Sequence, residues 1–137
     1  MEIPHGRGLE GHSDGDALLH AIADAVLGAL GEGDLGRHFP ASDPSLAGIA
    51  SSELLGRVME LARSKGFRIA NLDATIVAQE PRLAPHQAKM ATSIAETLGT
   101  EAGRVNLKVT STDRLGAIGR GEGIAALAVV MLEKAGE

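Results

Sequence analysis

The chain has 137 residues, a formal net charge of −5 and no cysteine. This length suits one domain with room for a hydrophobic core. The acidic balance argues against nucleic acid as a partner. Without cysteine there are no disulfides, thiolate nucleophiles or thiolate-bound zinc, so any metal must be held by His, Asp or Glu. We find no signal segment and no apolar run long enough for a bilayer, and we expect a cytoplasmic protein with no membrane partner.

Two helices are predicted in the first half of the chain. Residues 1–12 are expected to be extended, and Ser13 or Asp14 is expected to cap a helix that ends near Leu30. A glycine-rich turn follows, within a polar loop over 31–51. A loop of that length is typically functional or mobile. The second helix comes directly after this loop.

Three polar residues of the first helix are spaced for one face. Asp16, His20 and Asp24 stand four residues apart, so a helix places them in one row. A row of Asp, His and Asp suits a metal ion or a proton transfer, and a solvated polar face is the alternative that the pattern leaves open. The core-facing stripe is expected to be Leu19, Ile22, Val26 and Leu30.

Helices and strands alternate through the rest of the chain. The expected elements are a helix over 51–65, a strand over 67–78 with a bulge at Asn71, a helix over 85–98 capped by Gly99, a strand over 105–110 and a strand over 124–133. The last strand is apolar enough to be buried. This alternation predicts a single domain over 1–137 of the α/β or α+β class, with helices on one face of a small sheet.

Three polar loops adjoin the predicted strands. Residues 78–83 leave a strand end, where ligands often bind, although a plain surface turn is the alternative. Residues 110–113 offer three hydroxyls to phosphate oxygens, although a Ser/Thr turn explains them as well. Residues 116–123 place an Arg and a Glu between glycines. Their GxxGxG pattern precedes a strand instead of a helix, which excludes a dinucleotide-binding turn.

The motifs gain specificity from their order along the chain. They read HSDGD-x-LLHA-x-xDA-x-LGA, then GDLGRHFPxSDP, then T-x-VAQ-x-P, then NLKVTSTDRLG, then GRGEGIAA. In this order they closely resemble one enzyme family, the 2-C-methyl-D-erythritol 2,4-cyclodiphosphate synthases of the non-mevalonate isoprenoid pathway. The resemblance covers essentially the whole chain from Gly11 onwards.

The resemblance implies a fold, an assembly and a reaction. The fold is a small mixed sheet with helices on one side, and the assembly is a homotrimer with active sites between neighbouring subunits. The enzyme is a phosphorus–oxygen lyase acting on 4-diphosphocytidyl-2-C-methyl-D-erythritol 2-phosphate. The 2-phosphate attacks the β-phosphate, which forms the cyclic diphosphate and releases CMP. A divalent metal is implied as cofactor, commonly zinc, with magnesium or manganese possible at the phosphates.

Roles of single residues follow from the same resemblance. His20 matches the helix-borne metal ligand, and Asp24 matches a carboxylate that orients its imidazole. His12 and Ser111 match the pair credited with transition-state stabilisation. The positions that match substrate contacts are His12 and Ser13; Asp34, Leu35, Gly36, Phe39, Pro40, Ala41, Ser42 and Asp43 along the erythritol and phosphate end; Ala78, Gln79, Glu80, Pro81, Arg82, Leu83 and Ala84 at the cytosine; Thr110, Ser111, Thr112 and Asp113 at the phosphates; and Arg120 near the trimer axis.

The chain departs from the family pattern at four places. Ala41 stands where the family has an acid, Asp113 shortens a Glu, and Ala117 replaces a Phe. No Asp-x-His strand precedes Gly11, although in the family it supplies two metal ligands. We therefore expect a chain truncated at its N-terminus relative to the family, with zinc bound weakly by His20 and low turnover.

Two other functions stay open at this point. One is a catalytically impaired fragment that still binds a cytidine nucleotide through 78–84 and 110–113. The other is a metal-dependent phosphohydrolase, which the motifs suggest without the family. Release of CMP or of inorganic phosphate distinguishes the three possibilities.

Overall fold

A three-stranded mixed sheet forms the centre of the molecule. The computed structural model describes residues 8–79, 84–120 and 124–136, with the backbone alone for residues 8–14 and 84. The strand order is β2–β1–β3, in which the central β1 runs parallel to β2 and antiparallel to β3. The strands are β1 (Phe67–Val77), β2 (Val105–Thr110) and β3 (Ala125–Lys134).

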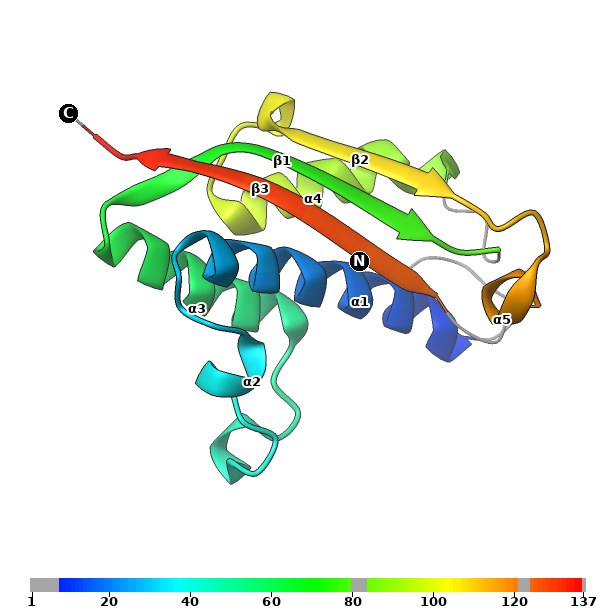
Figure 1. The fold of residues 1–137 in the computed structure, drawn as a ribbon, viewed down its shortest axis with the longest axis horizontal. Coiled ribbons are helices and arrows are strands. Elements are labelled where there is room, and N and C mark those ends of the chain that lie inside the picture. Colours follow the sequence, from blue (N-terminus) through cyan, green and yellow to red (C-terminus); the bar gives the residue numbers. More distant parts are fainter. Residues whose placement is uncertain (1–7, 80–83, 121–123, 137) are drawn as a thin grey trace.

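Three long helices lie on one face of this sheet (Figure 1). They are α1 (Gly8–Ala29), α3 (Ser51–Ser64) and α4 (Gln87–Leu98). Figure 1 shows α1 running below β3 and α4 behind β2. The predicted mixed sheet with helices on one face is therefore confirmed. No helix in the described part of the chain is long and apolar enough to cross a bilayer.

The hydrophobic core lies between the sheet and these helices. On β1, Leu72, Ala74 and Ile76 are at most 1 % exposed, as the predicted alternation requires. The core side of α1 includes Leu18, whereas the predicted Leu19 is only partly buried. Burying a large aliphatic side chain stabilises the fold by about 1.5–3 kcal/mol. The other large side chains that are less than 2 % exposed are Ile22, Val26, Leu27, Leu55, Val58, Met59, Met90 and Leu98.

The start of α1 differs from the prediction. Its first residue is Gly8, so residues 8–12 are helical instead of extended. Ser13 and Asp14 lie inside the helix and do not cap it. Leu9 is a good helix former, and the hydrogen-bonded ladder continues past a possible cap when the preceding residues can adopt helical angles.

The polar loop over 31–51 has more structure than predicted. It contains the short helix α2 (Leu35–His38) and a 3₁₀ turn, η1 (Pro44–Leu46). The predicted glycine turn is confirmed at its start, where Gly31 and Gly33 have φ angles of 71° and 81°. Glycine adopts these left-handed angles without steric cost. The turn brings the start of α2 beside α1, where the Leu35 amide donates to Asp24 Oδ1 at 2.8 Å, and the rest of the segment projects below α1 and α3 (Figure 1).

Local details of the remaining elements match the sequence. The pairing of β1 with β3 shifts register between Ile69 and Asn71, which confirms the bulge. A 3₁₀ turn, η2 (Ala84–His86), precedes α4. Gly99 ends α4 in the left-handed conformation with φ 66°, as a C-terminal glycine cap should.

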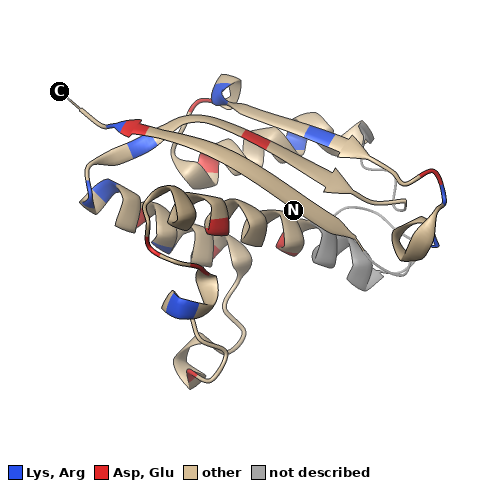
Figure 2. Cartoon of the chain, viewed as in Figure 1, with Lys and Arg blue, Asp and Glu red and all other residues tan. Residues whose placement is uncertain are grey.

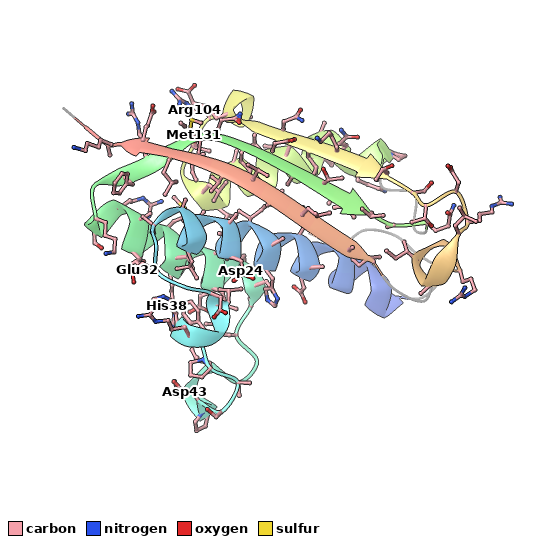
Figure 3. The ribbon with its side chains drawn as sticks, viewed as in Figure 1. Asp24, Glu32, His38, Asp43, Arg104 and Met131 are labelled. Atoms are coloured by element: carbon pink, nitrogen blue, oxygen red, sulfur yellow. The ribbon has the colours of Figure 1, made fainter. Side chains whose placement is uncertain are left out.

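The sheet face opposite the helices is uncovered and is apolar along β3, whereas β1 and β2 place polar residues there, such as Asp73 and Lys108. Alternate side chains of β3, namely Leu127, Val129 and Met131, are 61 %, 72 % and 67 % exposed. We call this surface the open face; Met131 is labelled in Figure 3. The prediction that the last strand is buried is therefore wrong within this chain. Only the intervening residues of β3, such as Val130, pack against the core, because successive side chains of a strand point to opposite faces.

Candidate active site

Two polar loops leave the parallel strands β1 and β2 at the same end of the sheet. Val77 and Thr110 are paired in register, and the Ala78 amide donates a hydrogen bond to the Thr110 carbonyl at 2.9 Å. Ligands of α/β sheets bind at the carboxyl ends of parallel strands. Two segments that the sequence assigned to one site, 78–79 and 110–113, thus lie side by side.

A side chain from the first loop holds the second. The Gln79 Oε1 atom accepts a hydrogen bond from the Arg114 amide at 2.8 Å. Asp113 and Arg114 have φ angles of 54° and 68°, in a left-handed region that non-glycine residues rarely occupy. A Cβ atom at Gly119 would lie 2.1 Å from the Arg114 carbonyl carbon, so only glycine permits this close packing. The loop is thus held in a costly conformation by its neighbours.

The hydroxyl groups of 110–113 have defined roles in the loop. Ser111 Oγ accepts from the Asp113 amide at 3.2 Å, and Thr112 Oγ1 donates to the Leu115 carbonyl at 2.6 Å. The bond from Asp113 uses only a lone pair of the Ser111 oxygen, so its hydroxyl proton remains available to an oxyanion. Ser111 and Thr110 are both exposed at this end of the sheet.

The glycine-rich segment after this loop is partly helical. Residues 116–119 form the short helix α5 (Gly116–Gly119), which corrects the prediction of a loop over 116–123. Figure 1 shows α5 at the same end of the molecule as the carboxyl ends of β1 and β2. Arg120 directly follows α5 and is exposed, whereas 121–123 lie outside the described residues.

His20 belongs to a second group, centred on Ser51. Ser51 Oγ donates to Asp16 Oδ1 at 2.8 Å and lies 3.2 Å from His20 Nε2. The Ser51 hydroxyl has one proton and the Asp16 carboxylate can only accept, so the bond to His20 requires a proton on Nε2. The neutral imidazole then keeps its lone pair on Nδ1. Sequence reasoning missed Ser51, because nothing in its spacing shows that the start of α3 packs against the middle of α1.

Asp24 has a different partner from the one expected. Its Oδ1 atom accepts from the Leu35 amide at 2.8 Å, and so joins α1 to α2. The ring nitrogen Nε2 of His20 bonds to Ser51 instead. In this arrangement Asp24 Oδ1 is bonded to the first amide of α2, and the role of Asp24 in orienting the imidazole stays a prediction. Asp34 also caps α2, by accepting from the Arg37 amide at 3.0 Å.

Asp43 structures the segment that the sequence placed along the erythritol end. Its Oδ1 atom accepts from the Ser45 hydroxyl at 2.7 Å and from the Ser45 amide at 2.9 Å. These two bonds hold the pKa of the Asp43 carboxyl below its ordinary value, the hydroxyl contributing most. Phe39 packs against the core, while Ala41 and Ser42 are exposed. The pair that begins α2, Leu35 and Gly36, lies in the same segment.

Several predicted site residues lie beyond what the structure describes. His12 and Ser13 have a described backbone, in α1, but not described side chains, and the same holds for Ala84 in η2. The residues wholly outside the described ranges are Glu80, Pro81, Arg82 and Leu83. Their predicted roles stay predictions.

The described residues around His20 do not supply a complete set of ligands for the predicted metal. Within the described ranges, no three His, Asp or Glu side chains lie close enough together to hold a metal ion. Asp16 approaches His20 only through the Ser51 hydroxyl. A catalytic zinc site needs about three protein ligands, so the described residues do not fit such a centre.

Fold and site define a class of protein: a small α/β domain with hydroxyl-bearing loops at the carboxyl end of its parallel strands. Comparison with known proteins narrows the class. A family model described as the YgbB family matches residues 1–133. The 2-C-methyl-D-erythritol 2,4-cyclodiphosphate synthase of Syntrophotalea carbinolica is 59 % identical over 135 residues, which are 98 % of this chain and 82 % of the relative.

Two solved structures share the fold. The bifunctional IspDF of Campylobacter jejuni has a TM-score of 0.84 and 37 % identity, with 98 % of this chain and 35 % of that chain covered. The IspF of Plasmodium falciparum, solved as a CDP complex, has a TM-score of 0.78 and 26 % identity, covering 98 % and 76 %. The chain therefore belongs to the YgbB family.

Proposed function

We propose that this chain cyclises 4-diphosphocytidyl-2-C-methyl-D-erythritol 2-phosphate to 2-C-methyl-D-erythritol 2,4-cyclodiphosphate with release of CMP. A non-bridging oxygen of the 2-phosphate attacks the β-phosphorus. The bond from that phosphorus to the oxygen bridging it to the CMP phosphate breaks, and CMP leaves with the electron pair. The main support is the 59 % identity to a synthase of that name over 98 % of the chain.

The geometry at the carboxyl end of the sheet fits this chemistry. The substrate carries its own nucleophile, so the protein must chiefly position two phosphates and stabilise developing charge. Ser111 can donate a hydroxyl proton to a phosphate oxygen, as argued above, and the Gln79 carboxamide fixes the adjoining turn. Both effects are of the electrostatic and positioning kind that phosphoryl transfer requires.

The nucleotide is proposed to bind between residues 78–84 and 110–113. The related structure of Plasmodium falciparum IspF is described as a CDP complex, which supports a cytidine nucleotide as ligand here. Backbone groups of 78–84 would read the base edge, and the hydroxyl-bearing loop would hold the phosphates. His12, Ser13, Arg120 and residues 34–43 are proposed as further substrate contacts on the strength of the family resemblance.

A divalent cation, zinc by the resemblance, is proposed as cofactor with His20 as one donor. The available lone pair would be that of Nδ1, since Nε2 bonds to Ser51. A bound divalent cation would neutralise phosphate charge. Because the described residues form no three-ligand site, we route no step of the reaction through the metal.

We also propose a homotrimer with active sites between subunits. The open face supports an assembly, since Leu127, Val129 and Met131 are each more than 60 % exposed on one contiguous strand. Apolar patches of this kind commonly mark protein–protein contacts. Subunits packed by their open faces would bury these side chains and bring the loops of neighbouring copies together.

Phosphorus-31 NMR of the reaction tests the proposed function. The purified 137-residue chain, incubated with substrate and zinc or magnesium, is expected to produce the cyclic diphosphate and CMP in equal amounts. Inorganic phosphate as the product would indicate the phosphohydrolase instead. Binding of CDP without CMP release, by protein shown to be folded, would leave a nucleotide-binding protein and contradict the proposed turnover.

A further inference from the structure

A cavity lies at the opposite end of the sheet from the candidate active site. Its volume is about 230 Å³, and it opens between the end of α3, the start of β1 and the turn after α4. Its floor is apolar: Met59, Ile69 and Leu98 are each at most 2 % exposed. The loops of the candidate active site follow the other ends of β1 and β2, so this cavity is a separate feature.

Three arginines from three elements line this cavity. Arg63 lies in the last turn of α3, Arg68 in β1 and Arg104 in the 3₁₀ turn η3 (Ala102–Arg104). Figure 2 shows several Lys and Arg segments at this end of the molecule, with acidic segments at the end of β3 and before β2. Figure 3 labels Arg104 there, above the sheet. A guanidinium presents a planar fork of donors that matches carboxylate and phosphate groups.

The positive charge of these arginines is only partly neutralised. Arg68 Nε and Arg104 Nη1 share one carboxylate oxygen of Glu133, at 2.9 and 3.4 Å. Arg104 also donates to the Ala70 carbonyl at 3.2 Å. Within the described ranges, the Arg63 side chain makes neither an ion pair nor a hydrogen bond, whereas its backbone carbonyl accepts from the Gly66 amide at 2.9 Å. One carboxylate thus serves two guanidinium groups, and the third has no counterion.

The local backbone keeps the Arg63 guanidinium beside the cavity. A Cβ atom at Gly99 would lie 2.8 Å from Arg63 Nη2, so the guanidinium occupies the space that a side chain would fill. Two groups oppose an anion: the Glu101 carboxylate, which also lines the cavity, and the carbonyl ends of α3 and α4. Three guanidinium groups outweigh the two carboxylates, so the net local charge stays positive.

We propose that this cavity binds a small dianionic oxyanion, such as a phosphate monoester or a dicarboxylate. Arg63 is the principal contact. Arg68 and Arg104 each donate some of their N–H groups to the ligand in place of Glu133. The apolar floor accommodates a short carbon portion. This site is independent of the proposed cyclisation, because it uses none of the same residues.

Titration of the full chain with inorganic phosphate and, separately, with succinate tests this site. At low ionic strength, which limits screening, the amide resonances of Gly99 and Thr100 are expected to shift with saturation. A shift with phosphate alone assigns a phosphate ligand, and one with succinate alone assigns a dicarboxylate. Phosphate is also expected to bind near residues 110–113. The two sites are distinguished by which amide resonances shift: those of Gly99 and Thr100, or those of 110–113.

Matched variants make the test decisive. Arg63→Gln should weaken binding at Gly99 by about tenfold or more, since it removes a charge-assisted hydrogen bond. Arg57→Gln, on the same helix but paired with Glu53 away from the cavity, should leave anion binding at Gly99 unchanged. Glu101→Gln should strengthen this binding, because it removes a negative charge beside the cavity. Saturable shifts absent for both anions, or equal losses in the two arginine variants, would overturn the proposal.

Discussion

Both faces of the sheet carry large aliphatic side chains, yet only one face is covered by this chain. On the helix side, Leu72 and Ile76 are fully buried, whereas on the open face Val129 and Met131 are 72 % and 67 % exposed. The open-face residues of β3 are as hydrophobic as those of the covered face, so hydrophobicity alone does not tell which side chains are buried. What differs is the availability of helices, because α1, α3 and α4 all cross the same side (Figure 1). An apolar strand thus indicates burial without specifying whether the cover comes from the same chain.

The covered face should carry most of the stability of the single chain. Leu72→Ala removes a side chain that is 0 % exposed in the middle of the core, and we expect a loss of about 2–5 kcal/mol in the free energy of unfolding. Chemical denaturation measures this loss. Val129→Ala, on the open face, is the matched comparison and should cost far less when the protein is diluted to the single chain. Equal losses would remove the distinction between the two faces.

The open face should instead control assembly. Val129→Glu places a charge where neighbouring subunits would otherwise bury an apolar side chain, and we expect the dissociation constant of the oligomer to rise at least about a hundredfold. Sedimentation velocity measures it. Ala88→Glu, on the exposed side of α4, should leave the assembly intact. A wild-type protein that is monomeric at micromolar concentration would contradict the proposed trimer.

The Gln79 bridge should be needed for nucleotide binding rather than for the fold. Gln79→Ala removes the acceptor of the Arg114 amide, which frees a left-handed turn to relax, and we expect CDP affinity to fall by about tenfold. Gln79→Glu retains an acceptor oxygen and should keep most of the affinity. Hydrogen exchange at the Arg114 amide should quicken in the alanine variant alone. Unchanged exchange in that variant would show that the bond does not hold the loop.

A smaller effect is expected at the Ser51 group. Ser51→Ala removes the acceptor of His20 Nε2, so the imidazole should lose its preference for the tautomer protonated at Nε2. Nitrogen-15 NMR of the ring reports this tautomer directly. Ser52→Ala, the neighbouring substitution at an exposed position, is the control and should leave the tautomer unchanged.

The smallest expected effect is the loss of the Asp43–Ser45 hydrogen bonds at low pH. The pKa of Asp43 is lowered by the Ser45 hydroxyl and amide, so its stabilisation of η1 is complete above the unfolded-state pKa. It is lost as the pH falls through the lower folded-state value. We expect the Ser45 amide resonance to titrate with a midpoint below the ordinary range for Asp. An ordinary midpoint would mean that the two hydrogen bonds do not persist in solution.

Much of the fold follows from local patterns. The strand over 105–110 and the glycine cap at Gly99 depend on residues close in sequence, and the structure confirms both. Burial of the last strand was predicted wrongly because it depends on what covers each face. The start of α1 was missed because Ser13 has cap chemistry without the backbone geometry of a cap.

The candidate site was less predictable than the fold. The register of β1 and β2 brings together the loops that the motifs had already marked as parts of one site. Ser51 and the partner of Asp24 could not be inferred, since each depends on contacts between segments 11 to 35 positions apart. Side-chain hydrogen bonds of this kind depend on how α1, α2 and α3 pack, and no sequence spacing specifies that packing.

The nucleotide is proposed to bind where the parallel strands β1 and β2 end. Titrating the isotope-labelled chain with CDP and following the amide resonances tests it most directly. We expect saturable shifts at Ala78, Gln79 and 110–114, with small changes at Gly99 in the distant cavity. Shifts confined to the cavity end, or no saturable shift at millimolar CDP in folded protein, would contradict it.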